Sequence, residues 1–193
     1  MKILFLIICI LLSGCGVREK EQPDKRPVTT EKSKKVNYYE EENKESVVGE
    51  AVTEIIDRGE NRVSNITLAC SQISGKKLSP GEEFSFNNIT GKKDKSSGYK
   101  DAPVLADGET SQGIGGGVCQ VSTTLYMAVL NGGLNVTEHY NHSEDVPYAP
   151  QGMDATVVYG VKDFKFINST SADIFIYTWV ENNRVYAKLV QMN

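Results

Sequence analysis

The stretch from Ser111 to Leu130, SQGIGGGVCQVSTTLYMAVL, constrains the fold more than any other part of the chain. It opens with four glycines, a residue type that tolerates positive φ and lets other backbone approach closely: Gly113, Gly115, Gly116 and Gly117. The run from Val118 to Leu130 contains no Gly or Pro. Its apolar residues recur at the spacing of one helix face: Val121, Leu125, Ala128 and Val129. This stretch predicts a tight loop that leads directly into an amphipathic helix.

Cys119 lies at the junction between the glycine loop and the predicted helix. Free N–H groups and a partial positive charge gather at a helix N-terminus, so a thiol there ionises more easily than a free one. The thiolate is the nucleophilic form of cysteine. Two interpretations remain open: Cys119 is an activated nucleophile, or it is a small buried residue in a tightly packed turn.

The remaining patterns predict a second helix and a series of strands. Residues 61–74 place an apolar stripe on one helix face, with Cys70 on its buried side and Gly75 as the stop signal. Strands are predicted at 83–88, 99–106, 134–140, 155–159, 164–167, 174–180 and 184–190, whereas 47–56 fits either a helix or a strand. The segregation of helices from strands favours an α+β fold. In this fold a central helix follows the glycine loop, a second helix packs alongside, and the sheet is antiparallel.

The first residues predict export and lipid attachment. Lys2 precedes ten apolar residues and the run Leu12-Ser13-Gly14-Cys15, a pattern typical of a bacterial lipoprotein signal. We therefore expect a signal peptide at 1–14, a lipid on Cys15, and a location on the outer face of the cell membrane. Residues 15–46 are rich in Lys, Glu, Pro and Thr and predict a disordered tether. The folded domain is expected at 47–193.

The candidate partners of a Cys119 nucleophile are the two histidines, His139 and His142. A helix from Cys119 to Asn131 is roughly 20 Å long. Seven extended residues span about 25 Å, so His139 can return over the length of this helix only on a nearly straight segment. His142 lies further along the chain and can return more easily. Either Asp154 or Asp163 could orient the imidazole. The two Cys and two His are dispersed without a paired short spacing, so neither a metal site nor a cofactor is expected.

The sequence GIGGGVCQVSTTLYMAVLNGGL, from Gly113 to Leu134, resembles the signature of the VanW-like family. Other matching segments agree in order: Asn65-Ile66, Leu78-Ser79-Pro80-Gly81-Glu82, Phe84-Ser85-Phe86-Asn87, Gly98-Tyr99, Asp154-Ala155-Thr156-Val157 and Tyr159-Gly160. The family is named for an accessory protein of B-type vancomycin resistance. The resemblance implies a role in the bacterial cell envelope and supplies no reaction.

Three functions remain open from the sequence. The domain is a cysteine-dependent peptidase or transpeptidase acting on peptidoglycan, a non-catalytic module that binds peptidoglycan or its peptide stems, or an assembly partner of other envelope proteins. The order of Cys before His is similar in layout to papain-like wall peptidases. The residues expected to face a ligand are Gly115, Gly116, Gly117, Gln120, Ser122 and Thr123. The net charge of −4 gives no basis for nucleic-acid binding. Cys70 and Cys119 could also form a disulfide.

Overall fold

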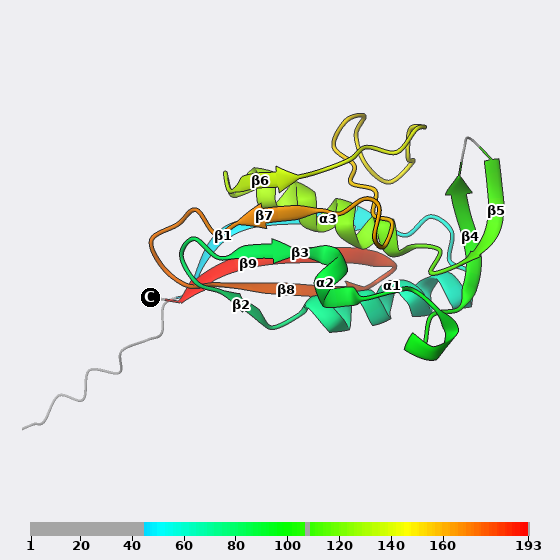
Figure 1. Ribbon diagram of the computed structural model, residues 1–193, viewed down its shortest axis with the longest axis horizontal. Helices are drawn as coiled ribbons and strands as arrows, with labels where there is room; N and C mark the ends of the chain where they lie inside the picture. Colours follow the sequence, from blue (N-terminus) through cyan, green and yellow to red (C-terminus); the bar gives the residue numbers. More distant parts are fainter. Residues whose placement is uncertain (1–44, 107–108, 193) are drawn as a thin grey trace, which may run out of the picture. The chain divides into compact units, whose positions relative to one another are not determined.

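The computed structural model describes residues 45–106 and 109–192, which form one compact unit (Figure 1). The predicted signal peptide at 1–14, the lipidation site at Cys15 and nearly all of the predicted tether lie outside the described residues. The first described strand begins at Glu45, slightly ahead of the domain start predicted at residue 47. In the part of the chain described, no helix combines the length and the apolar character needed to span a bilayer.

A four-stranded antiparallel sheet forms the base of the domain. Its strands lie in the order β1 (Glu45–Glu54), β9 (Arg184–Met192), β8 (Ile174–Glu181) and β2 (Lys76–Leu78). Alternate residues of the two central strands are buried on one face: Ile174, Ile176 and Thr178 on β8, and Val185, Ala187 and Leu189 on β9. This alternation is the period-2 pattern of a sheet with one covered face.

Two helices cover the buried face of this sheet. Helix α1 (Glu60–Ile73) packs on β8, and helix α3 (Val118–Asn131) packs on β1 and β9. Both helices were predicted from their apolar spacing, and both predictions are confirmed within one or two residues. The buried stripe of α1 includes Ile66, Cys70 and Ile73. The α+β class with antiparallel sheets is also confirmed.

The β8–β9 hairpin turns at Asn182 and Asn183, as the sequence predicts. Both residues have positive φ, at 49° and 58°. Two consecutive residues in this region give a turn whose twist matches that of the strands, and asparagine tolerates this conformation better than most residues. The turn therefore sets the register of the longest hairpin in the described domain.

A second sheet and a separate hairpin complete the domain. The second sheet has the order β3 (Glu83–Ser85), β7 (Lys165–Ile167) and β6 (Asn135–Glu138). The hairpin pairs β4 (Asp101–Ala106) with β5 (Glu109–Ile114). Short helical turns lie between β3 and β4, at Phe86–Thr90 (α2) and Lys95–Ser97 (η1).

Three sequence-based predictions about strands need correction. The strand predicted at 83–88 stops at Ser85, because the Ser85 hydroxyl accepts the Asn88 N–H and caps α2. The segment 109–114, expected to be only a lead into the glycine loop, is strand β5. The segment 155–159 is no strand: Ala155 bonds to hydroxyls of α3, and only Val158 forms an isolated bridge, to Lys162.

Strand β1, which the sequence left undecided, depends on a glycine. A Cβ atom on Gly49 would lie 2.6 Å from the Gly132 backbone nitrogen and would also overlap the Ala128 carbonyl oxygen at the end of α3. Real Cβ atoms do not approach backbone this closely. The strand therefore contacts the end of α3 backbone to backbone, and a side chain at this position would push the two apart.

Gly49→Ala is expected to destabilise the domain by about 2–4 kcal/mol, because neither backbone partner can move without disturbing α3. Gly59→Ala is the matched control. Its new Cβ would meet only the Asp57 carboxylate, at 3.3 Å, and should cost less than about 1 kcal/mol. Urea unfolding of both variants measures the difference. Equal midpoints would contradict the proposed contact.

Candidate active site

The glycine loop places the start of α3 directly against β4. A Cβ on Gly116 would lie 2.8 Å from the Ala102 carbonyl oxygen, so only glycine permits this approach. The fully buried Asn65 of α1 holds the same junction. Its amide nitrogen donates to the carbonyls of Lys100 and Gly116, and its amide oxygen accepts the Lys100 N–H. These three bonds attach the glycine loop to both β4 and α1.

Cys119 lies in the first turn of α3, next to the αL cap residue Gly117. The N–H groups of Val118 and Gln120 donate to the carbonyls of Gly115 and Gly117. The Cys119 N–H lies between the N–H groups of Val118 and Gln120. It belongs to the first turn, where backbone N–H groups have no carbonyl acceptor within the helix. The thiol therefore lies at the positive end of the α3 dipole.

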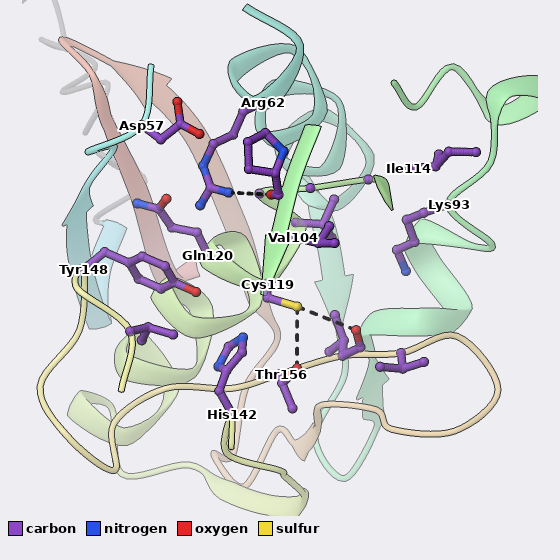
Figure 2. A pocket seen from close by; sticks show the side chains of 18 of the residues that line it. Asp57, Arg62, Lys93, Val104, Ile114, Cys119, Gln120, His142, Tyr148 and Thr156 are labelled. Atoms are coloured by element: carbon purple, nitrogen blue, oxygen red, sulfur yellow. Dashed lines mark hydrogen bonds between the residues drawn. The ribbon is translucent and has the colours of Figure 1, made fainter. Parts of the chain in front are cut away.

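His142 and Asp154 meet beside this thiol. The Nδ1 atom of His142 lies 2.6 Å from a carboxylate oxygen of Asp154, and the His142 backbone N–H donates to the same oxygen at 2.7 Å. The other carboxylate oxygen accepts the Asn141 amide. With Nδ1 bound to Asp154, Nε2 is the ring nitrogen of His142 that remains to act on the Cys119 thiol. Figure 2 shows the imidazole next to the sulfur.

The structure does not bring His139 to the thiol. Its Nε2 atom lies 2.6 Å from the Asp154 carbonyl oxygen, and its ring stacks on Tyr126 at 4.1 Å between centroids. It lies outside the pocket that Cys119 and His142 line. The other candidate orienting residue, Asp163, instead accepts bonds from Ser85 and the Asn87 N–H. Of the two histidines that chain length permitted, only His142 reaches Cys119.

Cys119 and His142 form a coupled acid–base pair. Burial is the largest single effect and acts to raise the pKa of the Cys119 thiol, but the effects of His142, Val157 and Thr156 together outweigh it and leave the pKa below its ordinary value. Burial acts to lower the pKa of His142, but Cys119 and Asp154 together raise it. The lowered pKa of Cys119 and the raised pKa of His142 both favour a thiolate beside an imidazolium. The sulfur also lies 3.7 Å from the Thr156 hydroxyl and 3.6 Å from the Val157 carbonyl oxygen.

The site opens into a pocket of about 710 Å³. Four of the predicted ligand-facing residues line it: Gly115, Gly116, Gly117 and Gln120. Ser122 and Thr123 do not line it. Their hydroxyls bond instead to the backbone of Ala155, which fixes the segment carrying Asp154 and Thr156 along α3. Their role in the described structure is internal support.

The pocket residues that were not among the predicted site residues include Arg62, Lys93 and Tyr148. Burial lowers the pKa of Lys93 to about 8, even though its ammonium donates to Asn87 and Thr90. Burial raises the pKa of Tyr148, which therefore keeps its proton. Figure 2 shows Arg62 and Tyr148 on one side of Cys119 and Lys93 on the other. These residues are distant in sequence and carry no motif of their own.

Cys70 has a different environment from Cys119. It is 2% exposed in the core, and burial raises its pKa to about 12. Both thiols are free, so the disulfide that the sequence left open is not formed. Among residues 45–106 and 109–192, no three His, Cys, Asp or Glu side chains gather in a way that could hold a metal ion.

The described domain thus belongs to the class of antiparallel α+β folds with a cysteine at a helix N-terminus and a histidine–aspartate pair beside it. Residues 61–190 match the family described as "VanW like protein". The chain belongs to the VanW-like family, and the resemblance noted in its sequence is confirmed.

Two curated relatives are similar to this chain, and one of them is named VanW. The "Uncharacterized protein YoaR" of Bacillus subtilis (strain 168) is 43% identical over 129 residues, which cover 67% of this chain and 43% of the relative. The "Vancomycin B-type resistance protein VanW" of Enterococcus faecalis (strain ATCC 700802 / V583) is 30% identical over 139 residues, which cover 67% of this chain and 49% of the relative. The chain therefore spans less than half the length of each. No solved structure matches the chain.

The pKa directions predict selective alkylation of Cys119. In the folded protein, its reaction with iodoacetamide should reach half its plateau rate well below pH 8.5, the ordinary thiol value. Cys70 should stay unreactive until unfolding. Asp154→Asn removes the charge that raises the pKa of His142, so it should move the Cys119 midpoint to higher pH. Mass spectrometry of the labelled peptides across pH 5–10 measures both. A Cys119 midpoint at or above 8.5 would contradict the thiolate assignment.

Proposed function

We propose that this protein is a cysteine-dependent acyl-transfer enzyme that acts on peptide bonds of the cell wall. The observation that carries the proposal is the Cys119–His142–Asp154 arrangement: a thiol in the first turn of a helix lines the same pocket as an imidazole that lowers the pKa of the thiol, and the Nδ1 atom of that imidazole lies 2.6 Å from a carboxylate. A nucleophile, a base in hydrogen-bond reach and a group that orients the base are the parts that nucleophilic catalysis requires.

The arrangement supports a two-step reaction. The Cys119 thiolate attacks the carbonyl carbon of a bound amide and forms a C–S bond. The first-turn N–H of Cys119 is placed to stabilise the resulting oxyanion. As the C–N bond breaks, the Nε2 proton of the His142 imidazolium passes to the leaving amine. Water or an amine then attacks the thioester and gives a proton to His142, and the C–S bond breaks to restore the thiolate. If water attacks the thioester, the enzyme is a peptidase. If an amine attacks it, the enzyme is a transpeptidase.

Asp154 has the positioning role in this scheme. Hydrogen bonds from His142 and Asn141 outweigh the effect of burial and lower the pKa of Asp154, so it stays ionised beside the imidazole. A fixed negative charge holds the ring in the tautomer that presents Nε2 to the sulfur, and it stabilises the imidazolium. Asn141 and the His142 backbone fix the carboxylate in turn.

The choice of cell-wall peptides as substrate rests on envelope context. The N-terminal sequence predicts lipid attachment at Cys15, which would place the domain outside the cytoplasm. A 30% identical relative is named as a vancomycin B-type resistance protein. Peptidoglycan and its peptide stems are the amide-rich polymer at that location.

A second candidate is a binding module that does not turn over its ligand. The pocket rim carries exposed apolar side chains, with Val158 at 48% and Tyr159 at 53% exposure. Such a rim could hold a peptide whether or not Cys119 reacts with it. The two candidates differ in what happens when the thiol is removed.

Incubation of the protein with purified peptidoglycan fragments, followed by mass spectrometry, tests the reaction. Cys119→Ala is expected to lower turnover at least about a thousandfold, and His142→Gln by a similar factor. Cys70→Ala is the control and should retain turnover, because Cys70 is buried away from the pocket. If Cys119→Ala binds fragments unchanged and the native protein never cleaves or joins them, the binding module is the correct function.

Anchoring has its own test. Cys15→Ala should prevent both lipid attachment and removal of residues 1–14, because a lipoprotein signal is processed at the lipid-modified cysteine. Fractionation with intact-mass measurement decides this. Cys9→Ala, inside the predicted signal peptide, serves as the control and should leave both properties unchanged. A Cys15→Ala protein that stays in the membrane with the same processed mass as the native protein would contradict lipidation at this residue.

A further inference from the structure

The pocket contains an unusual pair of buried polar atoms. Within the part of the chain that the structure describes, two buried side-chain nitrogen or oxygen atoms lack a hydrogen-bond partner: Arg62 Nε and Gln120 Oε1. Native proteins leave few such atoms unpaired, because a buried polar group without a partner loses the bonds it makes with water. Both residues line the same pocket, the one that holds Cys119.

The Gln120 side chain is fixed as an acceptor. It is 1% exposed, and its amide nitrogen already donates to the Thr53 hydroxyl at 3.1 Å and the Glu54 carbonyl at 2.8 Å. Exchanging the amide nitrogen and oxygen would set an acceptor against the Glu54 carbonyl, so the orientation is determined. The unpaired Oε1 can therefore receive only an N–H or O–H group from a ligand.

The Arg62 side chain supplies the opposite chemistry. One terminal nitrogen donates to the Pro103 carbonyl at 3.3 Å, which leaves Nε and other N–H donors of the guanidinium available. In Figure 2 the Arg62 guanidinium and the Gln120 amide are drawn on the same side of Cys119, Arg62 on α1 and Gln120 on α3. Asp57 also lines the pocket and is drawn on the same side of Cys119 as Arg62, whereas Lys93 lies on the other side. This side of the site offers a positive donor next to a neutral acceptor.

We propose that Arg62 and Gln120 bind the C-terminal residue of a peptide, with the guanidinium on its free carboxylate and Gln120 Oε1 on its backbone N–H. An amino-acid residue at a chain end carries these two groups on one carbon atom, whereas a side-chain carboxylate brings no N–H so close. Arginine binds carboxylates with charge-assisted bonds of defined geometry. The inference rests on the proposed function and deepens it.

The position of the pair also defines which bond would react. Gln120 follows Cys119 in α3, and both residues line the same pocket as Arg62. A C-terminal residue held by Arg62 and Gln120 presents the carbonyl that precedes it to the sulfur. The leaving group is then a single free amino acid. The specificity is that of a carboxypeptidase or of a transpeptidase that replaces the last residue of a stem.

Binding to the Cys119→Ala protein tests this assignment without requiring turnover. The probes are N-acetyl-alanyl-alanine, its C-terminal carboxamide and its analogue methylated on the last amide nitrogen, each in the L,L and D,D forms. Titration followed by NMR should show that at least one acid form binds about tenfold or more tightly than its carboxamide and its N-methyl analogue. Equal binding of acid and carboxamide, or no binding of any probe at millimolar concentration, would overturn the proposal.

Two arginine variants distinguish a direct contact between Arg62 and the peptide carboxylate from a general effect of the net charge of the protein. Arg62→Gln should abolish the preference for the acid, because it removes the only guanidinium in the pocket lining. Arg58→Gln makes the same charge change outside the pocket, at an exposed residue paired with Glu54, and should keep the preference. A preference that survives Arg62→Gln overturns the assignment. If the acid preference is found but the native protein does not cleave any peptide, the subsite stands and the catalytic proposal fails.

Discussion

The site depends on backbone-to-backbone contact between the glycine loop and β4. Gly116 lies against the Ala102 carbonyl with no room for a Cβ, and Asn65 joins the loop to both β4 and α1. This contact fixes where α3 begins, and therefore fixes the position and direction of the Cys119 side chain relative to the pocket. The same glycines line the pocket. The small size of these glycines allows the loop to pack against β4, and it also leaves the space in front of the Cys119 thiol open.

The Asp154 carboxylate organises the long segment that follows α3. A buried carboxylate needs several donors to offset its loss of water, and here they come from Asn141 and from both the backbone and ring of His142. The Asp154 carbonyl binds His139 in addition. One residue therefore holds the loop between 139 and 154 in a single arrangement and sets the imidazole beside the sulfur. Structural support and the electrostatics of the thiol are coupled through this residue.

The sequence predicted the elements with strong local signals and missed those that depend on distant partners. Helices α1 and α3 and the Asn182–Asn183 hairpin each have a periodic pattern or a turn signal of their own. Strand β1 exists through its pairing with β9 and its contact with α3 at Gly49, neither of which leaves a local pattern. In the site, chain length limited the partners of Cys119 to two histidines. Only tertiary structure shows that His139 stacks on Tyr126 and that Arg62 enters from α1.

The pairing of the first and last described strands has a consequence for how this domain combines with others. Glu45 pairs with Met192, so the chain enters and leaves the domain at adjacent points of one sheet edge. In Figure 1 these points lie at one end of the domain, and the β4–β5 hairpin lies at the other. A domain with this geometry can be inserted into a host polypeptide as a closed lobe, since joining both sides requires little extra chain. Neighbouring segments can then vary in length and kind. Longer architectures, such as those of the two bacterial relatives in which the matched segment makes up less than half of the chain, are compatible with this construction.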